Sequence, residues 1–276
     1  MAKKILRTSS SSDINLLIIY TGGTIGMIQD HISGELKPID FSQIKQEVPE
    51  IRKFNYNLDV ISFRPVIDSS DMQPGHWVEM AGLIQKNYKA YDGFVILHGS
   101  DTLAYTASAL SFMLENLSKP VIITGSQLPV GEVRTDAKEN LITAIEIAAT
   151  KINGLPAVSE VAVYFDYFLF RGNRVTKMNS SKFEAFQSVN FQPLAEAGVH
   201  LKFNEHLLLK PSKKALKVYT KLDDQIGVAQ IYPGMSKSWF VSQLNSKGLK
   251  ALVLQTFGSG NAPSQGWFIE ELQKAI

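Results

Sequence analysis

The sequence predicts an α/β protein with a larger N-terminal domain, whose mostly parallel sheet is flanked by helices, and a smaller C-terminal α/β domain. Short, nearly continuous apolar runs alternate with amphipathic stretches of helical length, as in parallel sheets covered on both faces. The 276 residues are 45% apolar and 20% charged, which is typical of globular proteins. Helical and strand periodicity fades between residues 191 and 222 and then returns. We therefore expect the larger domain at 1–190, a linker at 191–222 and the smaller domain at 223–276.

The strands of the larger domain are expected at five apolar runs, residues 16–20, 60–63, 94–97, 121–124 and 161–165. Apolar residues recur at helical spacing between these runs, within 77–88, 103–114 and 141–148. Crossovers in such sheets are right-handed, and ligands bind outside the carboxyl ends of the strands. Functional residues are therefore expected in the loops that lead from strands into helices.

The second half of the chain has weaker signals. A turn at 171–173 predicts a β-hairpin within 168–175. In the smaller domain we expect strands at 226–231 and 251–255 and helices near 237–244 and 265–276. The chain stops on that last helix without another strand to cover the small sheet, so we expect this domain to be incomplete at its C-terminus.

Composition excludes several functions. The formal net charge is +2, which gives no general attraction to nucleic acid or to an anionic membrane. No apolar run approaches the roughly 20 residues of a membrane span, and the first run is too short for a signal peptide. With no cysteine, and with five histidines in no ligand spacing, we expect neither a metal nor another cofactor. These observations favour a cytoplasmic protein that binds a small molecule.

The first predicted strand ends in a Thr-Gly-Gly-Thr-Ile-Gly run at 21–26. Its glycines permit a sharp turn, and Thr24 stands in a setting similar to the turn that exposes a serine nucleophile in other hydrolases. Thr24 is therefore a candidate nucleophile. A phosphate-binding loop is disfavoured because neither Gly-Lys-Ser/Thr nor the Gly-x-Gly-x-x-Gly spacing is present. Taken alone, the run also fits a simple tight turn.

Polar side chains follow the second and third predicted strands as well. The Asp-Ser-Ser-Asp run at 68–71 offers hydroxyls and carboxylates that suit a zwitterionic ligand, although it also fits a turn before the next helix. After the third strand, Ser100 offers a hydroxyl and Asp101 an anion able to hold an ammonium group, or a cap for the following helix. His98 fits a structural histidine better than a catalytic base, and Lys177 by itself fits a solvated surface residue.

Four motifs together resemble the bacterial L-asparaginases, and their order and context resemble the type I, cytoplasmic branch. The motifs lie at 20–27, 68–72, 98–102 and 171–177, and the similarity continues through 231–234 and 258–263. Four motifs in the same order are far more specific than any one alone. The resemblance implies hydrolysis of L-asparagine to L-aspartate and ammonia. Because glutamine differs from asparagine by only one methylene, worth about 1–3 kcal/mol in a pocket, we also expect some activity toward glutamine.

The resemblance also implies a role for each candidate residue. Thr24 would attack the side-chain amide and form an acyl-enzyme that water hydrolyses. Ser100, Asp101 and Lys177 would form a second hydroxyl triad that manages protons, with Asp101 also pairing with the α-ammonium. The segment at 68–70 (Asp68, Ser69 and Ser70) would hold the α-carboxylate end. Because neutralising a free lysine at pH 7 costs roughly 4.6 kcal/mol, we expect Lys177 to act as a charged or proton-sharing group.

Asn261 resembles a residue that family members lend to the active site of a neighbouring subunit, which implies a homodimer or homotetramer. The chain departs from the family at several positions. Ser100 replaces the usual threonine, the segment at 27–41 lacks a tyrosine near Gly34, and Gln255 stands where some members carry an effector-binding arginine. Family chains also continue further at the C-terminus.

Two alternatives stay open at the level of sequence. An amino-acid-binding regulatory module would use the same pocket without complete chemistry, and the missing tyrosine favours this interpretation. An amidase subunit of a tRNA-dependent amidotransferase would add a tRNA partner. Such an amidase normally carries an additional N-terminal domain, whereas only about 15 residues precede the first predicted strand in this chain.

Overall fold

The structure is a computed structural model that describes residues 3–8, 13–29, 36–38 and 46–276. The chain divides into two compact units, Met1–Thr220 and Lys221–Ile276. Each unit has its own core and is described separately.

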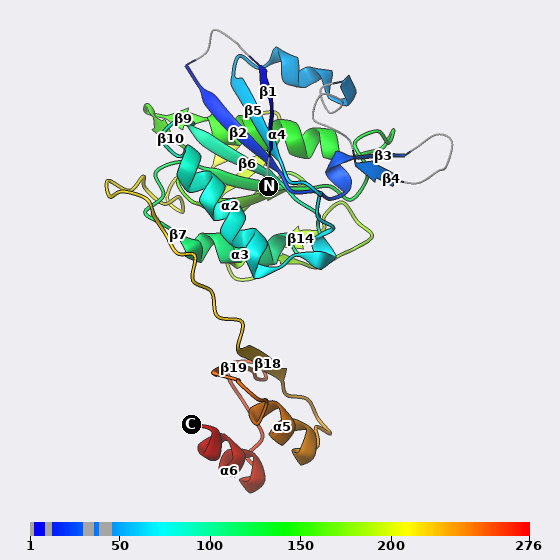
Figure 1. Cartoon of the computed structure of the whole chain (residues 1–276), viewed down its shortest axis with the longest axis vertical. Helices are drawn as coiled ribbons and strands as arrows, with labels where there is room; N and C mark the ends of the chain where they lie inside the picture. Colours follow the sequence, from blue (N-terminus) through cyan, green and yellow to red (C-terminus); the bar gives the residue numbers. More distant parts are fainter. Residues whose placement is uncertain (1–2, 9–12, 30–35, 39–45) are drawn as a thin grey trace. The chain divides into compact units, whose positions relative to one another are not determined.

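Within the described residues, nine strands of the first unit form one sheet in the order β1-β5-β2-β6-β8-β11-β12-β15-β16 (Figure 1). The five central strands pair in parallel, and the other pairings are antiparallel. This topology confirms the predicted fold class and all five predicted strands. The bounds are β1 Lys3–Thr8, β2 Asn15–Tyr20, β5 Asn57–Ser62, β6 Gly93–Leu97, β8 Val121–Thr124, β11 Val161–Phe165, β12 Phe168–Arg171, β15 Ala195–Ala197 and β16 Leu201–Phe203.

Helices cover both faces of this sheet. Helices α2 (Pro74–Asn87) and α3 (Leu103–Met113) lie over one face, and α4 (Ala137–Ala149) lies over the other (Figure 1). Strand β2 shows why its sequence is continuously apolar: Leu17 and Ile19 pack in the core under α2 and α3, while Leu16 and Ile18 pack in the core under α4. All four are fully buried, and burying each contributes about 1.5–3 kcal/mol.

Short elements complete the first unit. Strand β3 pairs with β4, β9 with β10, β13 with β14, and β7 with β17. The bounds of these strands are β3 Met27–Gln29, β4 Leu36–Pro38, β7 Leu114–Glu115, β9 Lys151–Ile152, β10 Leu155–Pro156, β13 Thr176–Lys177, β14 Phe186–Gln187 and β17 Lys217–Val218. Four 3-10 turns lie at η1 Thr24–Gly26, η2 Pro49–Lys53, η3 Ser69–Asp71 and η4 Gly172–Arg174 within the described ranges.

Two predictions differ from the structure. The segment 191–222, expected to be a linker, contains β15 and β16, which extend the sheet, and the boundary between units falls after Thr220. The hairpin expected within 168–175 is wrong: β12 pairs with β11, and Asp166 and Tyr167 form the turn with positive φ angles of 45° and 73°. The glycine-containing turn at 171–173 belongs instead to η4, which leads from β12 to β13.

The second unit pairs two parallel strands, β18 (Ile226–Gln230) and β19 (Ala251–Gln255), with helices α5 (Lys237–Leu244) and α6 (Gly266–Ala275). Its core is small and centres on Ile231, Phe240 and Phe268. All four elements match the predicted ones. Across the described parts of the chain, no helix is long and apolar enough to cross a membrane.

Candidate active site

Three loops meet at the carboxyl ends of β2, β5 and β6. The loop after β2 joins both of its neighbours through Thr21, whose N–H donates to Leu97 O at 3.0 Å and whose carbonyl accepts from Ile67 N at 2.7 Å. The side chain of Thr21 also donates to Leu97 O, at 2.9 Å. The loops that carry the predicted motifs are therefore linked directly by backbone hydrogen bonds, as the sheet-edge rule predicts.

Glycines allow these loops to touch. Gly23 has φ 87°, a left-handed conformation that favours glycine, and a Cβ there would overlap the backbone of Gly99. On the other side, a Cβ on Gly99 would lie 2.5 Å from Ser69 Oγ and 3.4 Å from Gly23 Cα. The turn that precedes Thr24, the loop before Ser100 and the loop of Ser69 thus share one tightly packed junction.

Thr24 begins the 3-10 turn η1 immediately after Gly23, and its side chain is partly exposed. Tyr20 holds this turn in place, because its hydroxyl donates to Gly26 O at 2.9 Å and its ring occupies the space beside Gly26. Burial raises the pKa of Tyr20 well above its usual value, so its hydroxyl stays protonated and does not act as a base. Tyr20 therefore orders the turn. The other tyrosine close to these motifs in the sequence, Tyr105, is 68% exposed.

The loop after β5 is organised by Asp68, which precedes η3. One oxygen of its carboxylate accepts from both the N–H and the hydroxyl of Ser70, each at 2.9 Å. These hydrogen bonds lower the pKa of Asp68, so the carboxylate is charged. Ser69 is buried, its carbonyl accepts from Thr102 Oγ1 at 2.7 Å, and its hydroxyl has no hydrogen-bond partner among the described residues. Of the two serines, Ser69 therefore has the hydroxyl free to donate to a ligand.

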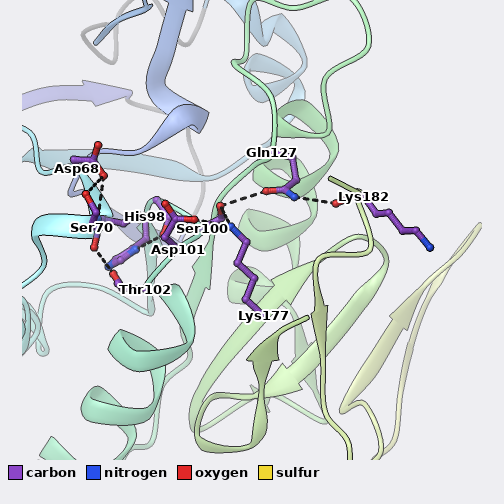
Figure 2. Close-up of polar contacts among 11 residues, drawn as sticks. Asp68, Ser70, His98, Ser100, Asp101, Thr102, Gln127, Lys177 and Lys182 are labelled. Atoms are coloured by element: carbon purple, nitrogen blue, oxygen red, sulfur yellow. Dashed lines mark hydrogen bonds and ion pairs between the residues drawn. The ribbon is translucent and has the colours of Figure 1, made fainter. Parts of the chain in front are cut away.

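Lys177 reaches the loop after β6 from a distant part of the sequence. Its Nζ donates to Ser100 Oγ at 2.9 Å and to Asp101 Oδ1 at 2.7 Å (Figure 2). The lysine side chain is only 17% exposed, whereas that of Asp101 is 65% exposed. The predicted grouping of Ser100, Asp101 and Lys177 is thus present in the structure, with the carboxylate toward solvent and the ammonium group largely enclosed.

Gln127 is a polar neighbour of this group that sequence reasoning missed. Ser100 Oγ donates to Gln127 Oε1 at 3.3 Å, and Gln127 Nε2 donates to Lys182 O at 2.9 Å (Figure 2). Asp136 fixes the backbone of Gln127 by accepting from its N–H at 2.9 Å. Gln127 follows β8, so applying the sheet-edge rule to the fourth parallel strand would have identified it.

His98 occupies a structural position, as expected. It is fully buried at the end of β6, with Nδ1 2.7 Å from Gly99 O and Nε2 2.8 Å from Thr106 Oγ1. Burial lowers the pKa of His98 to about 4, so the ring is neutral near pH 7. Both ring nitrogens already have partners, which leaves none for proton transfer with a substrate.

The remaining predictions fall elsewhere. Asn261 lies in the second unit, where its backbone bridges to Phe257, and the structure describes that unit by itself. Most of the segment 27–41, including the position near Gly34, lies outside the described residues. Among the residues that are described, no group of three or more His, Asp or Glu side chains is arranged to hold a metal ion.

Comparison with known proteins places this geometry in a family. The family model described as "Asparaginase, N-terminal" matches residues 15–209. L-asparaginase 1 of Escherichia coli strain K12 is 42% identical over 266 residues, which cover 95% of this chain and 76% of that protein. The chain belongs to the asparaginase family.

Solved structures agree with this assignment. The crystal structure of L-asparaginase I from Vibrio cholerae matches with a TM-score of 0.86 and 39% identity, covering 96% of this asparaginase chain and 78% of that one. A glutamyl-tRNA(Gln) amidotransferase component from Pyrococcus abyssi is 34% identical over 268 residues, which cover 94% of this chain but only 59% of that protein. The amidotransferase component is thus a related but more distant protein.

Proposed function

We propose that this asparaginase hydrolyses L-asparagine to L-aspartate and ammonia through an acyl-enzyme on Thr24. The packing of Gly23 against Gly99 carries the proposal, because it holds the turn of Thr24 beside the loop of Ser100 and Asp101. A nucleophile, a proton-handling pair and an anion for an ammonium group then lie on adjoining loops at one edge of the sheet. The L-asparaginases of Escherichia coli and Vibrio cholerae that this chain resembles support this chemistry.

The substrate is held at both charged ends of its α-carbon. Asp101, whose carboxylate is the exposed member of the ion pair with Lys177, accepts from the α-ammonium. The Ser69 hydroxyl donates to the α-carboxylate, while Asp68 shapes the turn by accepting both donors of Ser70. In this assignment Asp68 orients the donors and does not face the substrate carboxylate itself.

The reaction proceeds in two balanced steps. Thr24 Oγ attacks the side-chain amide carbon as its proton is withdrawn, the C–N bond breaks, and the nitrogen leaves with that proton as ammonia. Water then adds to the ester, one proton of that water goes to Thr24 Oγ, and aspartate is released with the water oxygen in its new carboxylate. Lys177 donates a hydrogen bond to Ser100 Oγ and so keeps that hydroxyl positioned to relay protons and hold the water. Backbone N–H groups of the two turns stabilise the oxyanion.

Assembly and location follow the same family likeness. We propose a homodimer or homotetramer in the cytoplasm, in which Asn261 of one subunit contacts substrate in the active site of another. Size-exclusion chromatography with light scattering measures the number of subunits. Glutamine is longer than asparagine by one methylene, a difference worth about 1–3 kcal/mol, so we expect weak glutaminase activity.

The decisive experiment measures ammonia release from L-asparagine by the wild type, Thr24→Ala and Thr24→Ser. The wild type releases ammonia, and Thr24→Ala loses at least about 10³-fold in kcat because no hydroxyl remains to form the ester. Thr24→Ser is the matched control, since it keeps the hydroxyl and removes only a methyl group. Thermal unfolding of all three proteins verifies that the turn still folds.

The same samples separate the alternatives. A wild type that binds asparagine without releasing ammonia would identify a regulatory module. Release that needs a charged tRNA would identify an amidotransferase component. Full turnover by Thr24→Ala would show that another group is the nucleophile.

A further inference from the structure

A polar cluster whose His98 and Thr106 are fully buried lies next to the Ser100 loop and plays no part in the proposed mechanism. Trp77 of α2 donates from Nε1 to Thr106 Oγ1 at 2.9 Å, and Thr106 of α3 lies 2.8 Å from Nε2 of His98. His98 Nδ1 in turn lies 2.7 Å from Gly99 O. We call these three side chains the His98 relay. It connects two helices to the peptide bond that leads into Ser100.

The chemistry of the groups fixes the direction of every hydrogen bond in the relay. The indole N–H of Trp77 can only donate, and the carbonyl of Gly99 can only accept. His98 Nδ1 must therefore carry the proton. A neutral imidazole has one N–H, so Nε2 is an acceptor and the hydroxyl of Thr106 donates to it. The relay runs one way, from Trp77 through Thr106 and His98 to the carbonyl of Gly99.

Burial keeps this arrangement intact. His98 and Thr106 are both fully buried, and burial lowers the pKa of His98 to about 4. The ring is therefore neutral under ordinary conditions, and its tautomer is set by the Gly99 carbonyl, which can only accept. A protonated ring would have two donors and would leave the Thr106 hydroxyl as its acceptor, at the cost of a buried charge.

The carbonyl at the end of the relay belongs to the peptide that also carries the Ser100 N–H. In a trans peptide the C=O and N–H point in opposite directions. Holding the Gly99 carbonyl on His98 therefore directs the Ser100 N–H away from the imidazole ring. Ser100 N has no backbone partner among the described residues, so it is free to donate to a developing oxyanion.

We propose that His98 is a positioning residue, which orients the Gly99–Ser100 peptide so that the Ser100 N–H faces the reacting amide. This inference rests on the proposed function, and it assigns to His98 a role that acts through the backbone and not through proton transfer. Trp77 and Thr106 support the role by giving Nε2 of the ring a hydrogen-bond donor that is itself held in place. Figure 2 shows His98 next to the Ser100 and Asp101 loop.

The test compares His98→Asn, His98→Leu and Thr106→Val in ammonia release from L-asparagine. The Asn amide nitrogen lies where Nδ1 lies and can still donate to Gly99 O, whereas leucine cannot. We expect His98→Leu to lose about 10- to 100-fold in kcat, less than the 10²–10³-fold cost of deleting an oxyanion donor. His98→Asn should stay within about threefold of the wild type, Thr106→Val should fall between them, and KM should change by less than about threefold in all.

Tyr88→Phe serves as the control for the loss of a partly buried side-chain hydrogen bond. The Tyr88 hydroxyl bonds Ser118 Oγ at 3.1 Å and accepts from Ser118 N at 2.7 Å, away from the site loops. The Tyr88→Phe substitution should lower the melting temperature of the protein without lowering kcat. Equal losses of kcat in His98→Asn and His98→Leu, or losses that follow melting temperature across all four variants, would overturn the proposal.

Nitrogen NMR of imidazole-labelled wild type gives an answer that does not depend on activity. At pH 7 the His98 ring should be neutral with the proton on Nδ1, and Thr106→Val should keep that tautomer because the Gly99 carbonyl still accepts from Nδ1. A proton on Nε2 in the wild type would overturn the proposal even if ammonia is released. A wild type with the expected tautomer but no ammonia release would instead contradict the proposed function, and the positioning role would fall with it.

Discussion

Two polar clusters lie on opposite sides of the Ser100 loop, and they handle charge in opposite ways. Toward solvent, Lys177 and Asp101 form an ion pair whose carboxylate is 65% exposed. Toward the core, the His98 relay is closed and neutral. Because burying a charge is costly, the ion pair lies where water reaches it, while orientation is left to uncharged donors. The charged groups that contact substrate in the proposed reaction thus lie on the solvent side of the Ser100 loop, and the uncharged groups that orient its backbone lie on the core side.

Removing the ammonium group of Lys177 should have the largest effect on catalysis. In Lys177→Met, Ser100 loses its hydrogen-bond donor and Asp101 its partner, so we expect kcat for asparagine hydrolysis to fall about 10²- to 10⁴-fold, the range for a positioned proton-transfer group. Steady-state ammonia release measures it. Lys182→Met is the control, because Lys182 contacts Gln127 through its backbone carbonyl and its side chain is exposed. A kcat within about threefold of the wild type in Lys177→Met would contradict an active role.

The two sides of the loop also differ in how well the sequence predicts them. Parallel strands end at one edge, so the runs after β2, β5 and β6 could be grouped from their order alone. Lys177 could not be found this way, because β12 runs antiparallel and η4 and β13 then bring the lysine to the edge. Only the resemblance to a family pointed to Lys177. Trp77 and Thr106 lie on two different helices, so the spacing of residues along the sequence does not predict their hydrogen bond.

Fold prediction failed where elements are short. The strands β15 and β16 have three residues each, which is too few for a period-2 pattern, so the segment 191–222 was predicted to be a linker. Strand β1 was missed because it lies in a polar stretch at the sheet edge, paired on one side to β5. Long buried strands were predicted well, since both faces of each are apolar.

Neutralising the anion should have an intermediate effect that appears mainly in substrate capture. In Asp101→Asn the ammonium of asparagine loses a charged acceptor, worth about 1.5–3 kcal/mol, so we expect kcat/KM to fall roughly 10- to 150-fold. Initial rates at low asparagine concentration measure it. Glu115→Gln is the control, because it removes an exposed carboxylate 3.9 Å from Lys217, far along the chain from the site loops. An unchanged kcat/KM in Asp101→Asn would mean that another group holds the ammonium.

The smallest expected effect concerns stability. The lowered pKa of His98 should make the free energy of unfolding depend on pH, and the sign of that dependence can be worked out. The pKa of His98 is lowered from 6.5 to about 4 in the folded protein. A lowered pKa contributes stability that is present above pH 6.5 and is lost as the pH falls toward 4, because the unfolded chain takes up the proton first. Between pH 7 and pH 5 this loss amounts to about 2 kcal/mol in the free energy of unfolding.

The difference between variants isolates that contribution from all other titrating groups. Urea unfolding at pH 7 and pH 5 should show that His98→Asn, which has no proton to gain at this position, loses about 2 kcal/mol less than the wild type. Substituting the exposed His206 by Asn should leave the wild-type loss unchanged. If His98→Asn and the wild type lost the same free energy of unfolding, the ring would be charged or accessible in the folded state. The relay could then not hold a single tautomer, and the contrast between a charged outer cluster and a neutral inner one would not stand.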